Sequence, residues 1–307
     1  MNSPKAAKAG IADMPPPIAE GGIRFLLGGD RFVLVEVGEG MELSLNIKVI
    51  QLAKRIMDEK IEGVIETLPM FVSVLIHYDS LALSPTRLRS VVEAVWNEMA
   101  HEVDMTLSSR LIELPVYYRD PLTRECVEQY NRQIAPMEDN PTYVARINEL
   151  GGPEELVRRH SSTQHWVAGI GFYAGTPELL PLDPRVTLTV PKYNPPRLYT
   201  VAGAIGVGGG FTSIYPVDSP GGYYIIGRTP TPIYSLDTRL VPFRGKATLL
   251  EPGDRIKFRP ISPEENEFIE AQVKAGTYRY LIWDYELFSF SRYSDWLAGL
   301  DHSADQI

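Results

Sequence analysis

Residues 200–230 read TVAGAIGVGGGFTSIYPVDSPGGYYIIGRTP, and this stretch decides how the second half of the chain folds. It holds eight glycines in 31 positions, separated by β-branched and aromatic residues instead of the Ser, Gln and Lys of a flexible linker. Glycine permits positive φ and lets another backbone or a ligand approach closely. The stretch therefore predicts strands that turn sharply at tight barrel corners, some of which line a pocket.

A phosphate-binding loop is the alternative interpretation of the glycines at positions 203–210. Such a loop should open a helix and preferably carry Lys or Ser at its start. This run leads instead into the strand-like residues 211–215. We therefore favour barrel corners over a phosphate loop.

Two patterns divide the rest of the chain. Between residues 164 and 261, prolines and glycines separate many short β-type runs, which predicts a closed barrel or a sandwich. The earlier pattern predicts a strand at 32–37, a helix at 45–56, strands at 64–67 and 71–78, a helix at 85–99 and a strand at 111–117. This β-α-β-β-α-β order is the ferredoxin-like arrangement, so the predicted fold class is α+β.

These patterns predict five segments. They are a disordered lead-in at 1–20, a ferredoxin-like domain at 21–119, a connector with short helices at 120–162, a β-barrel at 163–262, and a helix with an aromatic-rich extension at 263–307. A tail this aromatic seldom stays solvated. We expect the extension either to fold over the barrel or to provide a partner surface.

Composition narrows the classes of function. The net charge of −9 argues against a surface for nucleic acid or an anionic membrane. The single cysteine, Cys126, excludes an internal disulfide and a Cys-based zinc site, and is typical of a reducing cytosol. No run approaches the ~18 apolar residues of a membrane helix, so we expect a cytoplasmic protein. His77 and His101 have no second ligand at metal spacing, so no metal site is predicted.

An ordered set of short motifs carries a family resemblance. It comprises Gly29-Asp30, Gly63-Val64, Leu75-Ile76-His77-Tyr78-Asp79, Leu114-Pro115-Val116-Tyr117-Tyr118, His160-Ser161, Gly171-Phe172, Leu182-Asp183-Pro184-Arg185, Pro191-Lys192, Pro196-Arg197, Ala202-Gly203, Ile214-Tyr215-Pro216, Ser219-Pro220-Gly221-Gly222, Gly227-Arg228-Thr229-Pro230 and Pro252-Gly253-Asp254-Arg255. Over about residues 25–275, the chain resembles the B subunit of ATP-dependent 5-oxoprolinase, also called allophanate hydrolase subunit 1 or the Kip sporulation-kinase inhibitor family.

The resemblance implies a ferredoxin-like domain followed by a cyclophilin-like β-barrel, and it implies half of a pair. A related second subunit, similar to the C subunit of 5-oxoprolinase or to allophanate hydrolase subunit 2, would complete an ATP-dependent hydrolase of lactams or amides. The first alternative is a carboxyltransferase subunit that acts on urea-like amides with a biotin-bearing partner. The second is a non-catalytic module that inhibits a kinase. No cofactor is expected on this chain itself, because ATP or biotin would come through partner subunits.

Four residues depart from the family pattern. Ala174, Thr176 and Glu178 stand in a segment that in the family usually reads Gly-Phe-x-Pro-Gly-Phe-Pro-Tyr-Leu, and Phe211 replaces a Gln after the glycine run. These departures fall in predicted pocket loops. They point to a changed substrate, or to the non-catalytic alternative.

Basic and hydroxyl side chains gather in the glycine-rich stretch and in the loops before it. Chemistry on a carboxylate or an enolised amide develops charge on oxygen, which fixed cationic donors stabilise. We predict substrate-binding roles for Arg185, Lys192, Arg197, Thr212 and Arg228, with Lys192 and Arg197 foremost, and catalytic proton-handling roles for His160 and Tyr215. Alternatively, Arg185 and Arg228 pair with Asp183 and a backbone carbonyl and only fix loops.

Overall fold

The structure is a computed structural model that describes residues 17–19, 21–99, 105–284 and 286–300. His101 and all but residues 17–19 of the predicted lead-in at 1–20 lie outside the described residues. In the described part of the chain, no helix is both long enough and apolar enough to span a membrane.

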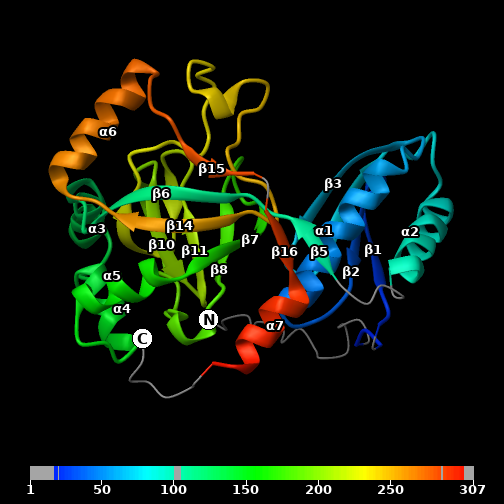
Figure 1. Cartoon of the computed structure of the whole chain (residues 1–307), viewed down its shortest axis with the longest axis horizontal. Helices are drawn as coiled ribbons and strands as arrows, with labels where there is room; N and C mark the ends of the chain where they lie inside the picture. Colours follow the sequence, from blue (N-terminus) through cyan, green and yellow to red (C-terminus); the bar gives the residue numbers. More distant parts are fainter. Residues whose placement is uncertain (1–16, 20, 100–104, 285, 301–307) are drawn as a thin grey trace, which may run out of the picture.

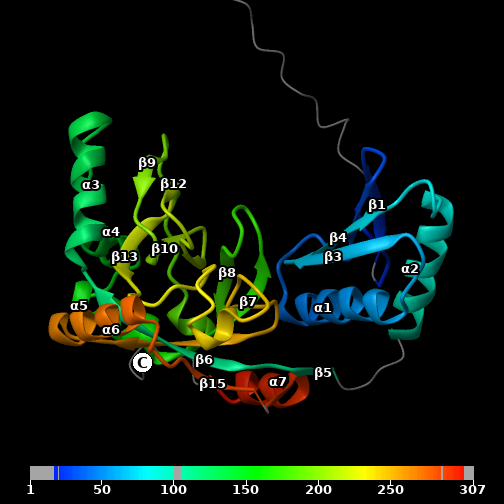
Figure 2. The same ribbon diagram turned by 90° about the horizontal axis from the view of Figure 1, so that it is seen from above.

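The N-terminal region is an antiparallel sheet with helices on one face. Its elements are β1 (Arg24–Gly28), β2 (Phe32–Glu36), α1 (Leu43–Asp58), β3 (Val64–Met70), β4 (Ser73–Tyr78) and α2 (Pro85–Met99), and its strand order is β1-β2-β4-β3. Every second residue of β2 and β4 is buried, as in Val33, Val35 and Ile76, and these side chains pack against α1 and α2. Both helices lie on the same side of the sheet (Figure 2), so no described helix covers the opposite, open face.

The predicted strand at 111–117 pairs with none of these four strands, so the expected ferredoxin-like strand order is wrong. As β6 (Leu111–Tyr118), it pairs in parallel with β14 (Arg255–Pro260) over six residues. The position beside β2 is taken by β1, a strand that the sequence pattern did not predict. The physical reason is that an apolar run shows that a strand is buried but does not specify its partner.

The second region is a closed barrel of seven strands (Figure 1). It consists of β6, β14, β7 (Gln164–Ile170), β8 (Pro177–Pro181), β11 (Phe211–Ile214), β10 (Ala204–Gly208) and β13 (Tyr224–Arg228). The pairing of β8 with both β7 and β11 closes the ring. Buried side chains such as Val167, Leu179, Ile205 and Phe258 fill its core.

The glycine-rich stretch forms the barrel strands and turns that its composition predicts. Gly209 and Gly210 both have positive φ and make the turn from β10 into β11. The described residues after this turn form a strand and not a helix, which contradicts a phosphate loop. A two-stranded arm of β9 (Arg197–Thr200) and β12 (Ser219–Gly221) projects from the same stretch.

The predicted connector contains three short helices, α3 (Pro121–Gln133), α4 (Asn140–Ile147) and α5 (Pro153–Ser162). They gather beside the barrel, on the side away from the N-terminal sheet (Figure 1). Asp120 and Asp139 cap the first two through backbone N–H groups.

The C-terminal extension ties the two regions together. After α6 (Pro263–Ala275), β15 (Leu281–Trp283) adds to β6, β16 (Leu287–Ser289) pairs with β5 (Thr106–Ser108), and α7 (Phe290–Ala298) follows. Phe288 packs in one cluster with Ile47 of α1 and Trp166 of β7. The described residues of the extension thus fold onto the rest of the chain, and a partner surface on its exposed side stays a prediction.

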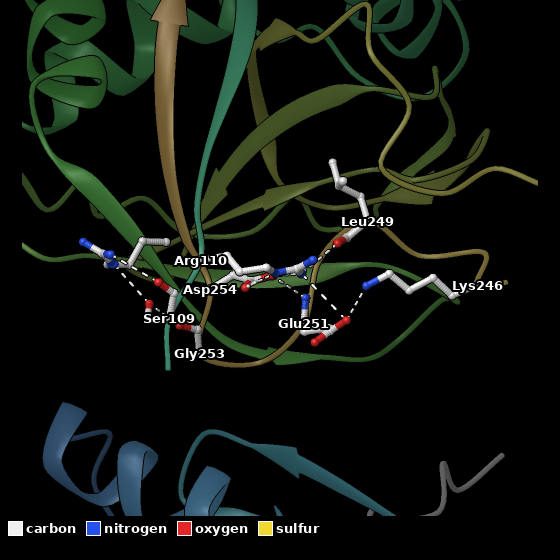
Figure 3. A network of polar contacts seen from close by, with 8 residues as sticks. Ser109, Arg110, Lys246, Leu249, Glu251, Gly253 and Asp254 are labelled. Atoms are coloured by element: carbon white, nitrogen blue, oxygen red, sulfur yellow. Dashed lines mark hydrogen bonds and ion pairs between the residues drawn. The ribbon is translucent and has the colours of Figure 1, made fainter. Parts of the chain in front are cut away.

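A polar network fixes the start of β6 to the Pro252-Gly253-Asp254 turn (Figure 3). The Arg110 guanidinium donates to both carboxylate oxygens of Asp254, at 2.8 and 2.5 Å, and to the carbonyl oxygen of Leu249 at 2.9 Å. The Ser109 hydroxyl donates to the Gly253 carbonyl at 2.7 Å. Because Asp254 is buried, this bidentate pair aligns β6 with β14 more firmly than a surface ion pair could.

Asp254→Asn should therefore destabilise the protein by about 2–3 kcal/mol, because Arg110 loses its bidentate partner in a partly buried site. The measurement is the free energy of unfolding from urea titration. Asp237→Asn is the matched control, since it removes the same charge from the exposed Arg239 pair and should cost less than about 1 kcal/mol. Equal losses in both variants would contradict the role given to Asp254.

Candidate functional site

Two tyrosines of the glycine-rich stretch pack against glycine residues, at positions where any other side chain would clash with the tyrosine ring. Tyr215 follows β11, and a Cβ on Gly221 would overlap its ring. Tyr223 precedes β13, and a Cβ on Gly208 would lie 2.6 Å from its ring. The glycines therefore hold both phenol groups in fixed positions at one end of the barrel.

These tyrosines border a cavity of about 390 Å³, a size typical of small-molecule sites. Its walls come from the loop before β8, from β8 and β11, and from both ends of the β9–β12 arm. The lining residues are Phe172, Tyr173, Thr176, Glu178, Lys192, Tyr193, Pro196, Ser213, Tyr215, Pro220, Gly221, Gly222 and Tyr223.

Glu178 is the carboxylate of this cavity. Burial raises its pKa to about 7, although the Tyr223 hydroxyl, which donates to Oε2 at 3.1 Å, and the charge of Lys192 oppose the rise. Lys192 places its Nζ 5.1 Å from the centre of the Tyr223 ring. The cavity thus contains two kinds of functional group. Glu178 can take up or release a proton near neutral pH, and the Lys192 ammonium group can bind an anionic oxygen.

Arg197 lies behind the cavity and does not line it. Its guanidinium donates to the Tyr223 carbonyl at 2.6 Å and to the Tyr215 hydroxyl at 3.4 Å, and it stacks 4.7 Å from the centre of the Tyr193 ring. Burial raises the pKa of the Tyr215 phenol, and the charge of Arg197 acts in the opposite direction. Arg197 therefore positions the tyrosines, while Tyr215 faces the cavity.

His160 and Thr212 contact each other inside the barrel instead of lining the cavity. His160 Nε2 lies 3.2 Å from the Thr212 hydroxyl, and Nδ1 lies 2.7 Å from the Tyr118 hydroxyl. Burial lowers the pKa of His160 to about 3, and its ring stacks on Phe258. The imidazole is therefore neutral at physiological pH and is held as part of the core.

Arg185 and Arg228 are held in ion pairs elsewhere. Arg185 donates to Asp183 at 2.7 Å, and Arg228 contacts Asp120 at 3.0 Å and Glu270 at 2.5 Å. The structure thus places only Lys192 and Tyr215 of the seven predicted site residues on the cavity wall, with Arg197 in direct support.

Sequence reasoning did not assign Glu178, Thr176 and Tyr223 to the site. The available signal was that Thr176 and Glu178, only two residues apart, both depart from the pattern of the family that the sequence resembles. Among the described residues, no three His, Cys, Asp or Glu side chains gather as a metal site would require.

Comparisons with known proteins agree on one family. Residues 23–242 match the model of the carboxyltransferase domain, subdomain C and D. The chain is 32% identical to the urea amidolyase of Lachancea kluyveri over 281 residues, which are 90% of this chain and 15% of that protein. It is 29% identical to the B subunit of 5-oxoprolinase from Bacillus subtilis over 245 residues, which are 77% of this chain and 92% of that relative.

The fold agrees as well. The crystal structure of the K. lactis urea amidolyase superposes with a TM-score of 0.82 at 28% identity, covering 91% of this chain and 17% of that chain. The chain spans about 15% of the length of the two curated urea amidolyases, from Lachancea kluyveri and Saccharomyces cerevisiae, that it matches.

Glu178→Gln should remove a pH-dependent loss of stability. The folded protein keeps the Glu178 proton up to about pH 7, whereas the unfolded chain releases it near pH 4.5. The contribution of this group to stability is therefore complete below pH 4.5 and is lost as the pH rises through 7. Urea titrations at pH 5 and pH 8 should show wild type losing roughly 2 kcal/mol more than the variant, after discounting for partial solvent access. Parallel pH dependences would contradict the raised pKa.

Proposed function

The chain belongs to the carboxyltransferase domain family, subdomain C and D, and we propose that its cavity transfers a carboxyl group to the nitrogen of a small amide. One observation carries this proposal: Glu178, with its pKa near 7, and Lys192 line the same cavity. The longer match with the fungal urea amidolyases, which extends over 90% of this chain, supports an amide of the urea type as acceptor.

The residues of the cavity suit this chemistry. An amide nitrogen is a poor nucleophile, so its proton must leave as the bond from nitrogen to the carboxyl carbon forms. The bond between that carbon and the nitrogen of the carboxyl donor would break in the same transfer, and the donor nitrogen would take up a proton. The Glu178 carboxylate can accept this proton, because its pKa lies near the working pH and Tyr223 orients it. The Lys192 ammonium group stabilises the negative charge on the transferred carboxylate.

A biotin-bearing partner would supply the carboxyl group in activated form. The apolar surfaces of Phe172, Tyr173 and Pro196 in the cavity wall fit a largely apolar ring and chain, and Lys192 fits a carboxylate. Arg197 would act indirectly, by holding Tyr215 and Tyr223 in place. A partner remains necessary in this proposal, because the described residues supply no attachment site for biotin.

The second candidate is an ATP-dependent hydrolase of lactams or amides, of the 5-oxoprolinase type. The match to the B subunit of 5-oxoprolinase, which covers 92% of that relative, favours it. In this case Lys192 would bind the substrate carboxylate, and a related second subunit would supply the ATP site.

We further propose that the related second subunit packs on the open face of the N-terminal sheet. The four strands of this sheet each contribute one leucine to this face, and the strand pairing places these leucines side by side. They form a row in the order Leu26, Leu34, Leu75 and Leu68. Leu34, Leu75 and Leu68 also line a groove that includes Phe172 and Tyr173 of the cavity. A partner seated on this row would therefore reach the mouth of the cavity.

Lys192→Met should lower kcat/KM for the amide acceptor by about 100-fold, because charge on the transferred carboxylate loses its cation. The assay uses the chain purified with its related second subunit and its biotin-bearing partner, and it measures ATP turnover with urea, acetamide and 5-oxoproline. Lys274→Met, at an exposed position on α6, is the matched control and should keep full activity.

The same assay separates the two candidates. Turnover with urea or acetamide that avidin blocks is the expected result. Turnover with 5-oxoproline that avidin leaves unchanged would favour the hydrolase, and no turnover with any of the three would contradict both.

Leu75→Glu should abolish co-purification with the related second subunit, because it places a charge in the leucine row. Leu81→Glu, at a leucine that is 97% exposed and outside the row, should leave the complex intact. Size-exclusion chromatography with light scattering gives the composition of each sample, and thermal unfolding checks that both variants fold. A complex that survives Leu75→Glu would place the interface elsewhere.

A further inference from the structure

The hydroxyl group of Thr176 is buried without a partner. Thr176 is 6% exposed, and its Oγ1 makes no hydrogen bond with any residue that the structure describes. A buried hydroxyl group gives up its hydrogen bonds to water, so leaving it unpaired destabilises the fold. A ligand that accepts a hydrogen bond from this hydroxyl group would remove the destabilisation.

The surroundings of Thr176 identify where that ligand would lie. Thr176 lines the cavity just before β8, and Glu178, two residues later, lines it from the strand itself. Two other hydroxyl groups of the cavity already donate to protein oxygens. Ser213 donates to the Pro177 carbonyl at 2.8 Å, and Tyr223 donates to Glu178 at 3.1 Å.

We propose that Thr176 selects the substrate by donating its hydroxyl proton to the carbonyl oxygen of an amide whose N–H group donates to Glu178. This inference rests on the proposed function, because it assigns the amide acceptor to the same cavity. A hydroxyl donor and a carboxylate acceptor in one cavity wall match the adjacent C=O and N–H groups of an unsubstituted amide or ureido group. A carboxylic acid or a fully N-substituted amide lacks the N–H group, so it adds no second donor to the Tyr223 hydroxyl that already contacts Glu178.

Thr176 and Glu178 are both polar, and both lie on the cavity wall. They add hydrogen-bonding groups to a cavity whose wall also includes the apolar surfaces of Phe172 and Pro196.

Thr176→Val, which keeps the side-chain shape and removes the hydroxyl, tests the inference. Two measurements are made on the full chain: thermal unfolding, and binding of acetamide by ligand-observed NMR. We expect the variant to unfold about 2 °C higher than wild type, because an unpaired buried hydroxyl is gone. We expect its affinity for acetamide to fall about tenfold, because the carbonyl oxygen loses its donor. Thr176→Ser, which restores the hydroxyl, should recover the affinity.

Ser219→Ala is the matched control. Ser219 also has a buried hydroxyl without a partner among the described residues, but it does not line the cavity. This variant should gain stability in the same way and bind acetamide as wild type does. N,N-dimethylacetamide, which has no N–H group, should bind wild type weakly in comparison with acetamide.

The inference fails if Thr176→Val binds acetamide as wild type does, if it unfolds at a lower temperature than wild type, or if wild type binds neither amide. Failure of the proposed function looks different. In that case acetamide binding depends on Thr176 as expected, yet the complex with its partners turns over no amide.

Discussion

The six-residue parallel pairing of β6 with β14 is the interaction on which the rest of the structure depends. It joins residues 111–116 to residues 255–260, and each of these strands carries a further partner on its other side. Parallel neighbours need a long connection, and here the connection contains the whole of the remaining barrel. The Arg110–Asp254 pair fixes the register at the beginning of both strands. If that register moved by one residue, each buried side chain of β6 would face the opposite side of the sheet.

The same constraint sets the position of the cavity. Closure of the barrel brings β8 beside β11, which places Glu178 opposite Ser213. The glycines of β10 and β12 then admit the rings of Tyr223 and Tyr215 against bare backbone. Arg197 is buried between them, and its charge is offset by a carbonyl oxygen, a hydroxyl group and the face of Tyr193. The geometry of the site is therefore fixed by the backbone before any ligand binds.

The sequence predicted the element types well and their partners poorly. The glycine pattern of residues 200–230 predicted barrel strands and turns, because positive φ and close approach leave few other uses for so many glycines. The partner of residues 111–118 could not be predicted, because burial leaves the same apolar pattern in any sheet. Strand β1 was missed because Leu26 and Leu27 are exposed, which breaks the alternation expected of a half-buried strand. The candidate site could be predicted only in part for the same reason. Arg185 and Arg228 are held in ion pairs with acidic residues, and the sequence does not show which residues will be neighbours. The raised pKa of Glu178 comes from burial, which also depends on the fold.

Thr176 and Glu178 indicate a site more strongly than the predicted basic residues do. A partly buried carboxyl group and an unpaired hydroxyl both reduce stability, whereas Arg185 and Arg228 are held by acidic neighbours. The closed barrel tolerates Thr176 and Glu178 because its register is set elsewhere, by β6, β14 and the Arg110–Asp254 pair. Residues that weaken a fold and line a cavity are best explained by the ligand that they bind.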